Sequence, residues 1–161
     1  MRKVFHFDTP KENYQYQADA AILWCFDKRF DLVVRKFLNS IGVRQVDSIQ
    51  LAGGAKSLAS PEVERDREFI VEQVRKSMRL HGTKRVILTV HSDCGGYGGL
   101  AAFGNDAAVE AANHEQELQR AIAHLSRAIP GLEVQGYLLG FEGIWQVDAT
   151  GSRQDEDEAI A

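Results

Sequence analysis

Residues 85–96 read Arg-Val-Ile-Leu-Thr-Val-His-Ser-Asp-Cys-Gly-Gly, and this stretch decides the fold. Its first half is a short apolar run rich in β-branched residues, which predicts a strand buried on both faces. A histidine and a cysteine follow, and two glycines then allow the backbone to turn sharply. Strands of this kind belong to parallel sheets, whose carboxyl ends are where ligands bind in open α/β folds. We therefore expect a parallel sheet with a site at the end of this strand.

A second stretch earlier in the chain has the same design. Residues 20–25 read Ala-Ala-Ile-Leu-Trp-Cys, a continuous apolar run that ends on the other of the two cysteines. The residues that follow, Phe26 to Arg29, are partly charged, as expected where a buried strand leaves the sheet. Both cysteines therefore lie at the carboxyl ends of predicted strands.

Strands and helices alternate along the rest of the chain. Helices are expected from Phe30 to a left-handed end at Gly42, from a capping Ser60 to Gly82, and from a capping Asp106 to Ile129. Strands are predicted at residues 20–25, 46–51, 85–90, 133–139 and 144–147. This order of elements predicts the α/β class: one three-layer domain with a mostly parallel sheet, to which the last strand adds an antiparallel edge. For the parallel strands we assume the order 2-1-3-4, because the first and third strands must be neighbours for a shared site to form.

Length and composition limit the classes of protein. The 161 residues are enough for one domain with a full core, expected over residues 1–149, with 1–18 as an N-terminal arm and 150–161 as an acidic, disordered tail. A net charge of −4 argues against a nucleic-acid partner. Because the sequence has no apolar run of about 18–20 residues and no signal-peptide pattern, we expect a cytoplasmic protein with no membrane partner.

The predicted sheet brings three metal-ligand residues together. In the order 2-1-3-4, the first and third strands are neighbours, so Cys25 lies beside His91 and Cys94. Two cysteines and a histidine are a ligand set that zinc uses when one position stays open for water. The alternative is that Cys25 and Cys94 are buried free thiols that pack as small apolar residues.

Two charged residues just after Cys25 are candidates for catalysis. Side chains alternate along extended backbone, so Cys25, Asp27 and Arg29 are expected to point roughly the same way. Asp27 can accept a hydrogen bond from a water at the metal, and Arg29 can hold that carboxylate by a bidentate pair. The alternative is that Asp27 caps the following helix and Arg29 is solvated, and both interpretations can hold in part.

The two stretches, Cys25-Phe-Asp27-Lys-Arg29 and His91-Ser-Asp-Cys94-Gly95, resemble the two signatures of the β-class carbonic anhydrases. The resemblance implies that Cys25, His91 and Cys94 bind Zn²⁺, that Asp27 and Arg29 form the catalytic dyad, and that the protein is a homodimer or a higher homo-oligomer. The sequence departs from the family at residues 50–54, where Gln-Leu-Ala-Gly-Gly replaces Arg-Asn-Ala-Gly-Asn. It also lacks the long N-terminal helical arms, so it resembles a minimal or divergent member.

We therefore predict a zinc lyase in which a metal-bound hydroxide hydrates CO₂ reversibly to bicarbonate. The backbone N–H groups of Gly95 and Gly96 are candidates for binding the bicarbonate. One alternative is a hydrolase of a related heterocumulene, carbonyl sulfide or carbon disulfide. Another is a catalytically silent protein that binds zinc and a small anion, with Asp27 closing the metal site. A third, a nucleotide-binding domain, rests on the Gly-x-Gly-x-x-Ala pattern at residues 96–101.

Overall fold

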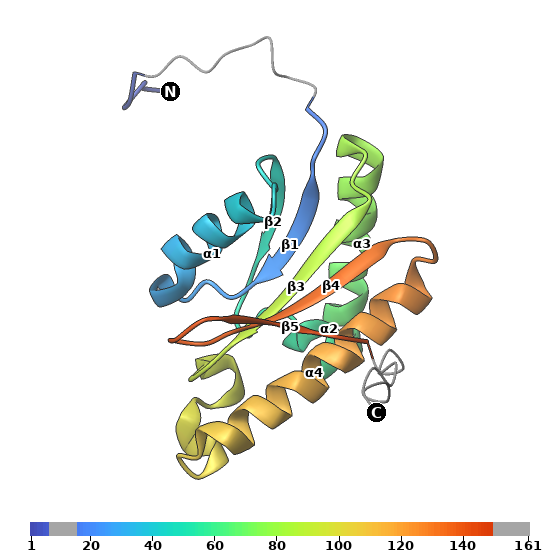
Figure 1. Ribbon diagram of the computed structural model, residues 1–161. Coiled ribbons are helices and arrows are strands. Elements are labelled where there is room, and N and C mark those ends of the chain that lie inside the picture. Colours follow the sequence, from blue (N-terminus) through green and yellow to red (C-terminus); the bar gives the residue numbers. More distant parts are fainter. Residues whose placement is uncertain (7–15, 150–161) are drawn as a thin grey trace, which may run out of the picture.

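Five strands form one sheet in the order β2-β1-β3-β4-β5 (Figure 1). The computed structural model describes residues 1–6 and 16–149. In it the strands are β1 (Ala20–Trp24), β2 (Val46–Gln50), β3 (Arg85–His91), β4 (Glu133–Leu139) and β5 (Ile144–Val147). The first four are parallel and β5 is antiparallel to β4. The predicted strand order and the predicted antiparallel edge strand are confirmed.

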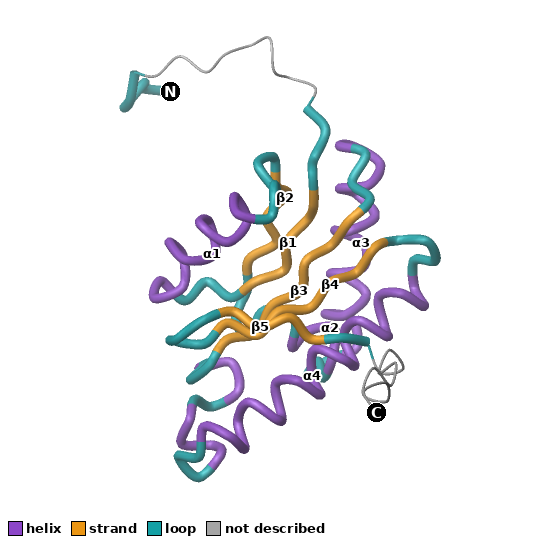
Figure 2. The backbone as a smooth tube through the Cα atoms, viewed as in Figure 1, coloured by secondary structure: helices purple, strands orange, loops and turns teal. Residues whose placement is uncertain are grey.

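Helices cover both faces of this sheet and complete three layers (Figures 1 and 2). One face carries α1 (Lys28–Ser40), and the other carries α2 (Lys56–Ala59), α3 (Glu64–His81) and α4 (Ala107–Ala128). Two short 3₁₀ turns, η1 (Gly95–Tyr97) and η2 (Leu100–Phe103), link β3 to α4. The predicted three-layer α/β class is therefore correct.

The core explains why β1 and β3 read as continuous apolar runs. Alternate residues of β1 face opposite layers: Ile22 packs with the residues of α1, whereas Leu23 packs with those of α3 and α4. All five residues of β1 are buried, and so are the six residues from Val86 to His91. Burying a single aliphatic side chain of this size contributes roughly 1.5–3 kcal/mol, so the two central strands anchor the fold.

Most predicted helix ends are confirmed, and one is wrong. Asp106 caps α4 by accepting hydrogen bonds from two backbone N–H groups, and Gly82 ends α3 in the left-handed conformation. Ser60 does not cap α3, which begins at Glu64 after Val63. Ser60 instead follows the short helix α2, and its hydroxyl donates to the buried carboxylate of Glu117 on α4. Because the Ser60 hydroxyl bonds to Glu117 on α4, it does not cap α3 as the local sequence pattern predicted.

The N-terminal segment is attached at the amino end of the sheet. The Tyr16 hydroxyl donates to Asp47 at 2.7 Å, and the Tyr16 ring stacks on His81 with the centroids 4.2 Å apart. The predicted tail at 150–161 and residues 7–15 of the predicted arm lie outside the described residues. Among the helices of the described residues, none has the length and apolarity needed to cross a bilayer.

The loop after β2 passes very close to the carboxyl ends of β1 and β3. Gly54 has φ +55°, and a Cβ there would lie 2.3 Å from the Thr89 carbonyl oxygen and 3.3 Å from the Cys25 nitrogen. The next residue, Ala55, donates its N–H to the same carbonyl at 2.9 Å. Only glycine combines this conformation with this approach.

We predict that Gly54→Ala destabilises the protein much more than Gly82→Ala does. Both positions have positive φ, so both variants carry a cost of about 1 kcal/mol for the left-handed backbone. Gly82 has open space around it, whereas Gly54 faces backbone atoms and should cost roughly a further 1–3 kcal/mol from overpacking. Urea unfolding of the three proteins measures this, and equal losses would contradict the account.

Candidate metal centre

The fold brings together the three residues predicted as metal ligands. Cys25 directly follows β1, His91 ends β3, and Cys94 lies in the turn after β3. Because β1 and β3 are paired neighbours, these positions meet at the same edge of the sheet. One ligand atom from each residue lies within 4.8 Å of the others, and all three residues are buried. Within the described residues, this is the one cluster of its kind.

The His91 ring is oriented as a ligand. Its Nδ1 lies 2.9 Å from the Ser92 carbonyl oxygen and therefore donates a proton to it. Its Nε2 is buried and has no hydrogen-bond partner among the described residues. Phe30 packs on the ring with the centroids 4.6 Å apart. A buried nitrogen without a partner beside two thiols fits a metal ion, because the hydrogen bond at the other nitrogen fixes the tautomer that coordinates.

The surroundings of the two thiols favour the ionised form of Cys25 and the protonated form of Cys94. Hydrogen bonding with Cys94 lowers the pKa of Cys25 to about 4, and the Cys25 sulfur in turn raises the pKa of Cys94. Burial lowers the pKa of His91, but the Cys25 sulfur and the Ser92 carbonyl outweigh that and raise it. Backbone N–H groups also face the sulfurs, those of Gly53 and Asp27 at Cys25 and those of Gly96 and Tyr97 at Cys94. Two sulfurs that share a buried site with an imidazole suit a borderline-soft cation such as zinc.

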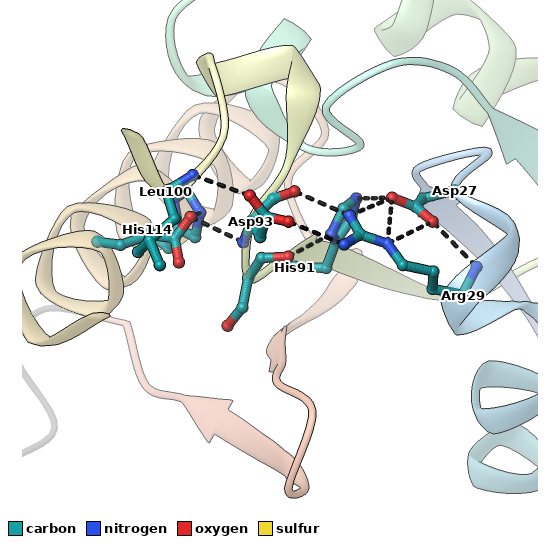
Figure 3. A network of polar contacts seen from close by, with 8 residues as sticks. Asp27, Arg29, His91, Asp93, Leu100 and His114 are labelled. Atoms are coloured by element: carbon teal, nitrogen blue, oxygen red, sulfur yellow. Dashed lines mark hydrogen bonds and ion pairs between the residues drawn. The ribbon is translucent and has the colours of Figure 1, made fainter. Parts of the chain in front are cut away.

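Asp27 and Arg29 form a close ion pair beside this cluster (Figure 3). The Arg29 Nη2 donates to Asp27 Oδ2 at 2.7 Å, and Nε lies 3.1 Å from both carboxylate oxygens. Asp27 also caps α1 by accepting from the Arg29 backbone N–H at 2.9 Å, so the predicted cap and the predicted pair with Arg29 occur together, and a role of Asp27 at a metal-bound water stays a prediction. The guanidinium lowers the pKa of Asp27 to about 2. Asp27 Oδ2 lies 3.9 Å from His91 Nε2.

Arg29 also contacts the second ligand-bearing loop. Its Nη1 donates to Asp93 Oδ2 at 2.8 Å, and its Nη2 donates to the Asp93 carbonyl oxygen at 2.9 Å. The other carboxylate oxygen of Asp93 accepts from the Leu100 backbone N–H at 3.0 Å. Asp93 thus contacts both Arg29 and the glycine-rich loop that follows Cys94. Arg29 therefore ties the loop after β1 to the loop after β3.

The glycine-rich loop after Cys94 packs against the loop after β2. A Cβ on Gly96 would lie 2.7 Å from Gly53, and the Gly96 carbonyl oxygen accepts from Lys56 Nζ at 2.7 Å. Lys56 was not among the residues predicted for the site. Binding of substrate by Gly95 and Gly96 stays a prediction. The Gly-x-Gly-x-x-Ala pattern runs into η1 and η2 rather than opening a long helix, unlike a dinucleotide-binding turn.

A groove of about 800 Å³ adjoins the site on the side of Asp93. It runs between the first turns of α4 and the β4–β5 hairpin. Phe141 and Trp145 line it and are exposed at 65% and 50%. The Phe141 ring also lies 5.4 Å from the Arg29 guanidinium carbon, which places this groove next to the ion pair.

Comparison with protein families agrees with the fold and the site. Residues 16–149 match the model of the family described as "Putative carbonic anhydrase". The chain belongs to this family, and the resemblance seen in its two motifs is confirmed. No curated protein matches the chain.

Solved structures of β-carbonic anhydrases have the same fold. One is isoform I from Trichomonas vaginalis, with a TM-score of 0.59 and 16% identity over 88% of each chain. Another is a carbonic anhydrase from Glaciozyma antarctica, with a TM-score of 0.57 and 19% identity over 84% of this chain and 85% of that one. A carbon disulfide hydrolase in its apo form is also similar, with a TM-score of 0.53 and 14% identity over 83% and 81%.

Proposed function

We propose that the protein is a zinc lyase that interconverts CO₂ and bicarbonate. The observation that carries this proposal is the buried His91 Nε2, which has no hydrogen-bond partner among the described residues and lies beside two thiols and near a carboxylate that Arg29 holds ionised. In this proposal Cys25, His91 and Cys94 hold the zinc ion. When bound, zinc supplies the Lewis acidity that lowers the pKa of water toward neutrality.

The residues of the chain would divide the remaining work. The Asp27 carboxylate accepts a hydrogen bond from the attacking water and so aims its oxygen at the CO₂ carbon. Arg29 keeps Asp27 ionised and fixed, because three of its contacts go to that carboxylate. A new C–O bond gives bicarbonate, and one proton passes to solvent. Backbone N–H groups of Gly95 and Gly96 are our candidates for contacts to the product.

The geometry of Asp27 favours this proposal over a catalytically silent zinc protein. In the silent alternative, Asp27 leaves Arg29 and takes the fourth position on zinc. That change would give up the hydrogen bonds from the Arg29 side chain and the cap of α1. Each of these contacts is partly exposed and contributes at most about 1 kcal/mol, but Asp27 would lose all of them together with the helix cap.

We also propose a cytoplasmic homodimer. The zinc site needs both thiols reduced, which fits a reducing compartment. The groove beside Asp93 carries the exposed rings of Phe141 and Trp145, and such apolar surfaces mark interfaces. Among the described strands, β5 pairs with β4 alone.

We expect Trp145→Lys to convert a dimer to a monomer in sedimentation equilibrium, whereas Leu80→Lys, at another exposed apolar residue, should not. A monomeric wild-type protein would contradict this.

We predict that the purified protein contains one zinc ion per chain. Replacing both cysteines, in Cys25→Ser with Cys94→Ser, should remove it, because serine is a poor zinc ligand compared with a thiolate. Asp27→Asn should keep it, since Asp27 is not one of the proposed ligands. Elemental analysis after dialysis measures all three proteins. If the double cysteine variant still contains zinc, or if the wild-type protein contains another metal instead of zinc, the proposed site is wrong.

We predict that the zinc-loaded protein hydrates CO₂ and that Asp27→Asn lowers kcat by roughly 10²–10⁴-fold, the usual contribution of a group that positions or transfers a proton. Asparagine caps helices as well as aspartate does, so α1 should remain intact. Asp31→Asn, in the first turn of the same helix, is the matched control and should leave kcat unchanged. Stopped-flow spectrophotometry with a pH indicator measures the rate.

The fold that the chain shares with a carbon disulfide hydrolase supports the alternative substrate class. Zinc-loaded protein that releases hydrogen sulfide from carbonyl sulfide or carbon disulfide, yet does not hydrate CO₂ above buffer, would replace the lyase proposal with that hydrolase. No turnover of any of the three substrates would leave the zinc-binding role alone.

A further inference from the structure

Helix α4 buries a carboxyl group against the loop that carries Cys94. Glu110 lies in the first turn of α4 and is only 2% exposed. Buried acids are rare because removal from water is costly unless hydrogen bonds replace the lost hydration. The N-terminal end of α4 offsets part of this cost, since the helix dipole favours negative charge there. The buried Glu110 carboxyl group is therefore expected to accept a hydrogen bond from a neighbouring part of the chain.

Glu110 holds a strained backbone turn at Asp93. Its Oε1 accepts from the Asp93 backbone N–H at 2.8 Å. Asp93 has φ +53°, and in the described chain only one other non-glycine residue, Asn105, has positive φ. Such a conformation costs on the order of 1 kcal/mol or more and persists only where neighbours fix it. Glu110 is one of those neighbours.

The space behind Glu110 leaves its carboxyl group little freedom. The ring of His114, one turn further along α4, is fully buried, and its Nε2 lies 3.5 Å from Glu110 Oε1. The Tyr97 ring packs on His114 with the centroids 4.6 Å apart. Burial, followed by the charge of His91, lowers the pKa of His114 to about 4, so the imidazole is neutral at pH 7. A neutral ring thus packs behind the carboxyl group that receives Asp93.

The turn at Asp93 in turn fixes Arg29. The Asp93 carboxylate and its carbonyl oxygen each accept one hydrogen bond from the guanidinium, at 2.8 and 2.9 Å. The Nε–H group and a second N–H of Nη2 hold Asp27. A continuous series of hydrogen bonds therefore runs from Glu110, in the first turn of α4, to Asp93 and Arg29 and on to Asp27, and Figure 3 shows its part from Asp93 to Asp27.

We propose that Glu110 is a positioning residue that fixes the Asp27 carboxylate at the metal centre by holding the Asp93 turn against Arg29. Its effect on catalysis rests on the proposed function, whereas its effect on the position of Arg29 does not. If Glu110 were only a residue of the packed core, an apolar side chain of similar length would replace it without loss. Apolar side chains commonly replace buried charged groups without loss of stability only where no hydrogen-bond partner is left unpaired.

Two substitutions at Glu110 separate these roles. Glu110→Gln keeps an acceptor oxygen at the same distance from the backbone, and Glu110→Met keeps the length and removes the acceptor. Glu68→Met, at an exposed acid of α3, is the control for the chemical change itself. Should Glu110→Met fail to fold, Glu110→Ala removes the same acceptor without adding apolar bulk.

Each protein is measured for kcat in CO₂ hydration, for zinc content, and for the NMR signal of the Arg29 Nε–H group. In Glu110→Met we expect one zinc per chain, kcat lowered about 10–100-fold as the geometry loosens, and an Arg29 signal that shifts or broadens. In Glu110→Gln and Glu68→Met we expect wild-type values.

A Glu110→Met protein with wild-type kcat and an unchanged Arg29 signal would overturn the proposal. Equal losses in Glu110→Met and Glu110→Gln would overturn it too, because glutamine retains the acceptor oxygen. If the wild-type protein does not hydrate CO₂, the proposed function fails, and the NMR signal of Arg29 then tests the positioning role by itself. A signal that changes in Glu110→Met but not in Glu110→Gln supports this role. A signal that changes in neither variant contradicts it.

Discussion

The parallel pairing of β1 with β3 is the constraint on which the site depends. These are the two strands whose residues are buried on both faces, and their carboxyl ends coincide at one edge of the sheet. Cys25 lies one residue beyond β1, and Cys94 lies three residues beyond the end of β3. If β1 or β3 paired with another strand instead, the two thiols would be separated, even if the loops that carry them kept their conformations. The metal centre is thus a consequence of core packing.

Charge balance then explains the polar groups around the ligands. Backbone N–H groups face both sulfurs, and Arg29 offers its donors to Asp27 and Asp93, one from each ligand-bearing loop. The ion pairs of Arg29 are partly exposed, so their contribution to stability is modest. Their importance is geometric, because the planar guanidinium fixes the directions in which both carboxylates lie. The ion pairs of Arg29 therefore fix the orientation of the two carboxylates more than they stabilise the fold.

Much of the fold and the centre of the site could be predicted from sequence, because they depend on local patterns. The apolar runs predicted the strands, the Asp106 cap predicted α4, and the spacing of Cys25, His91 and Cys94 predicted which residues meet. The start of α3 was wrong because Ser60 bonds to Glu117, 57 positions away. Glu110 was not predicted as a site residue either, because its partner Asp93 lies in a distant loop. In the sequence, an acid in the first turn of a helix is explained by the helix dipole alone.

In the site that we propose, Cys25, His91 and Cys94 hold one zinc ion while Arg29 keeps Asp27 off the metal. A crystal structure of the zinc-loaded protein at neutral pH tests it most directly. We predict an ion in contact with both sulfurs and with His91 Nε2, and an Asp27 carboxylate still hydrogen-bonded to Arg29. A carboxylate oxygen of Asp27 bound to the ion, with Arg29 turned away, would contradict the account.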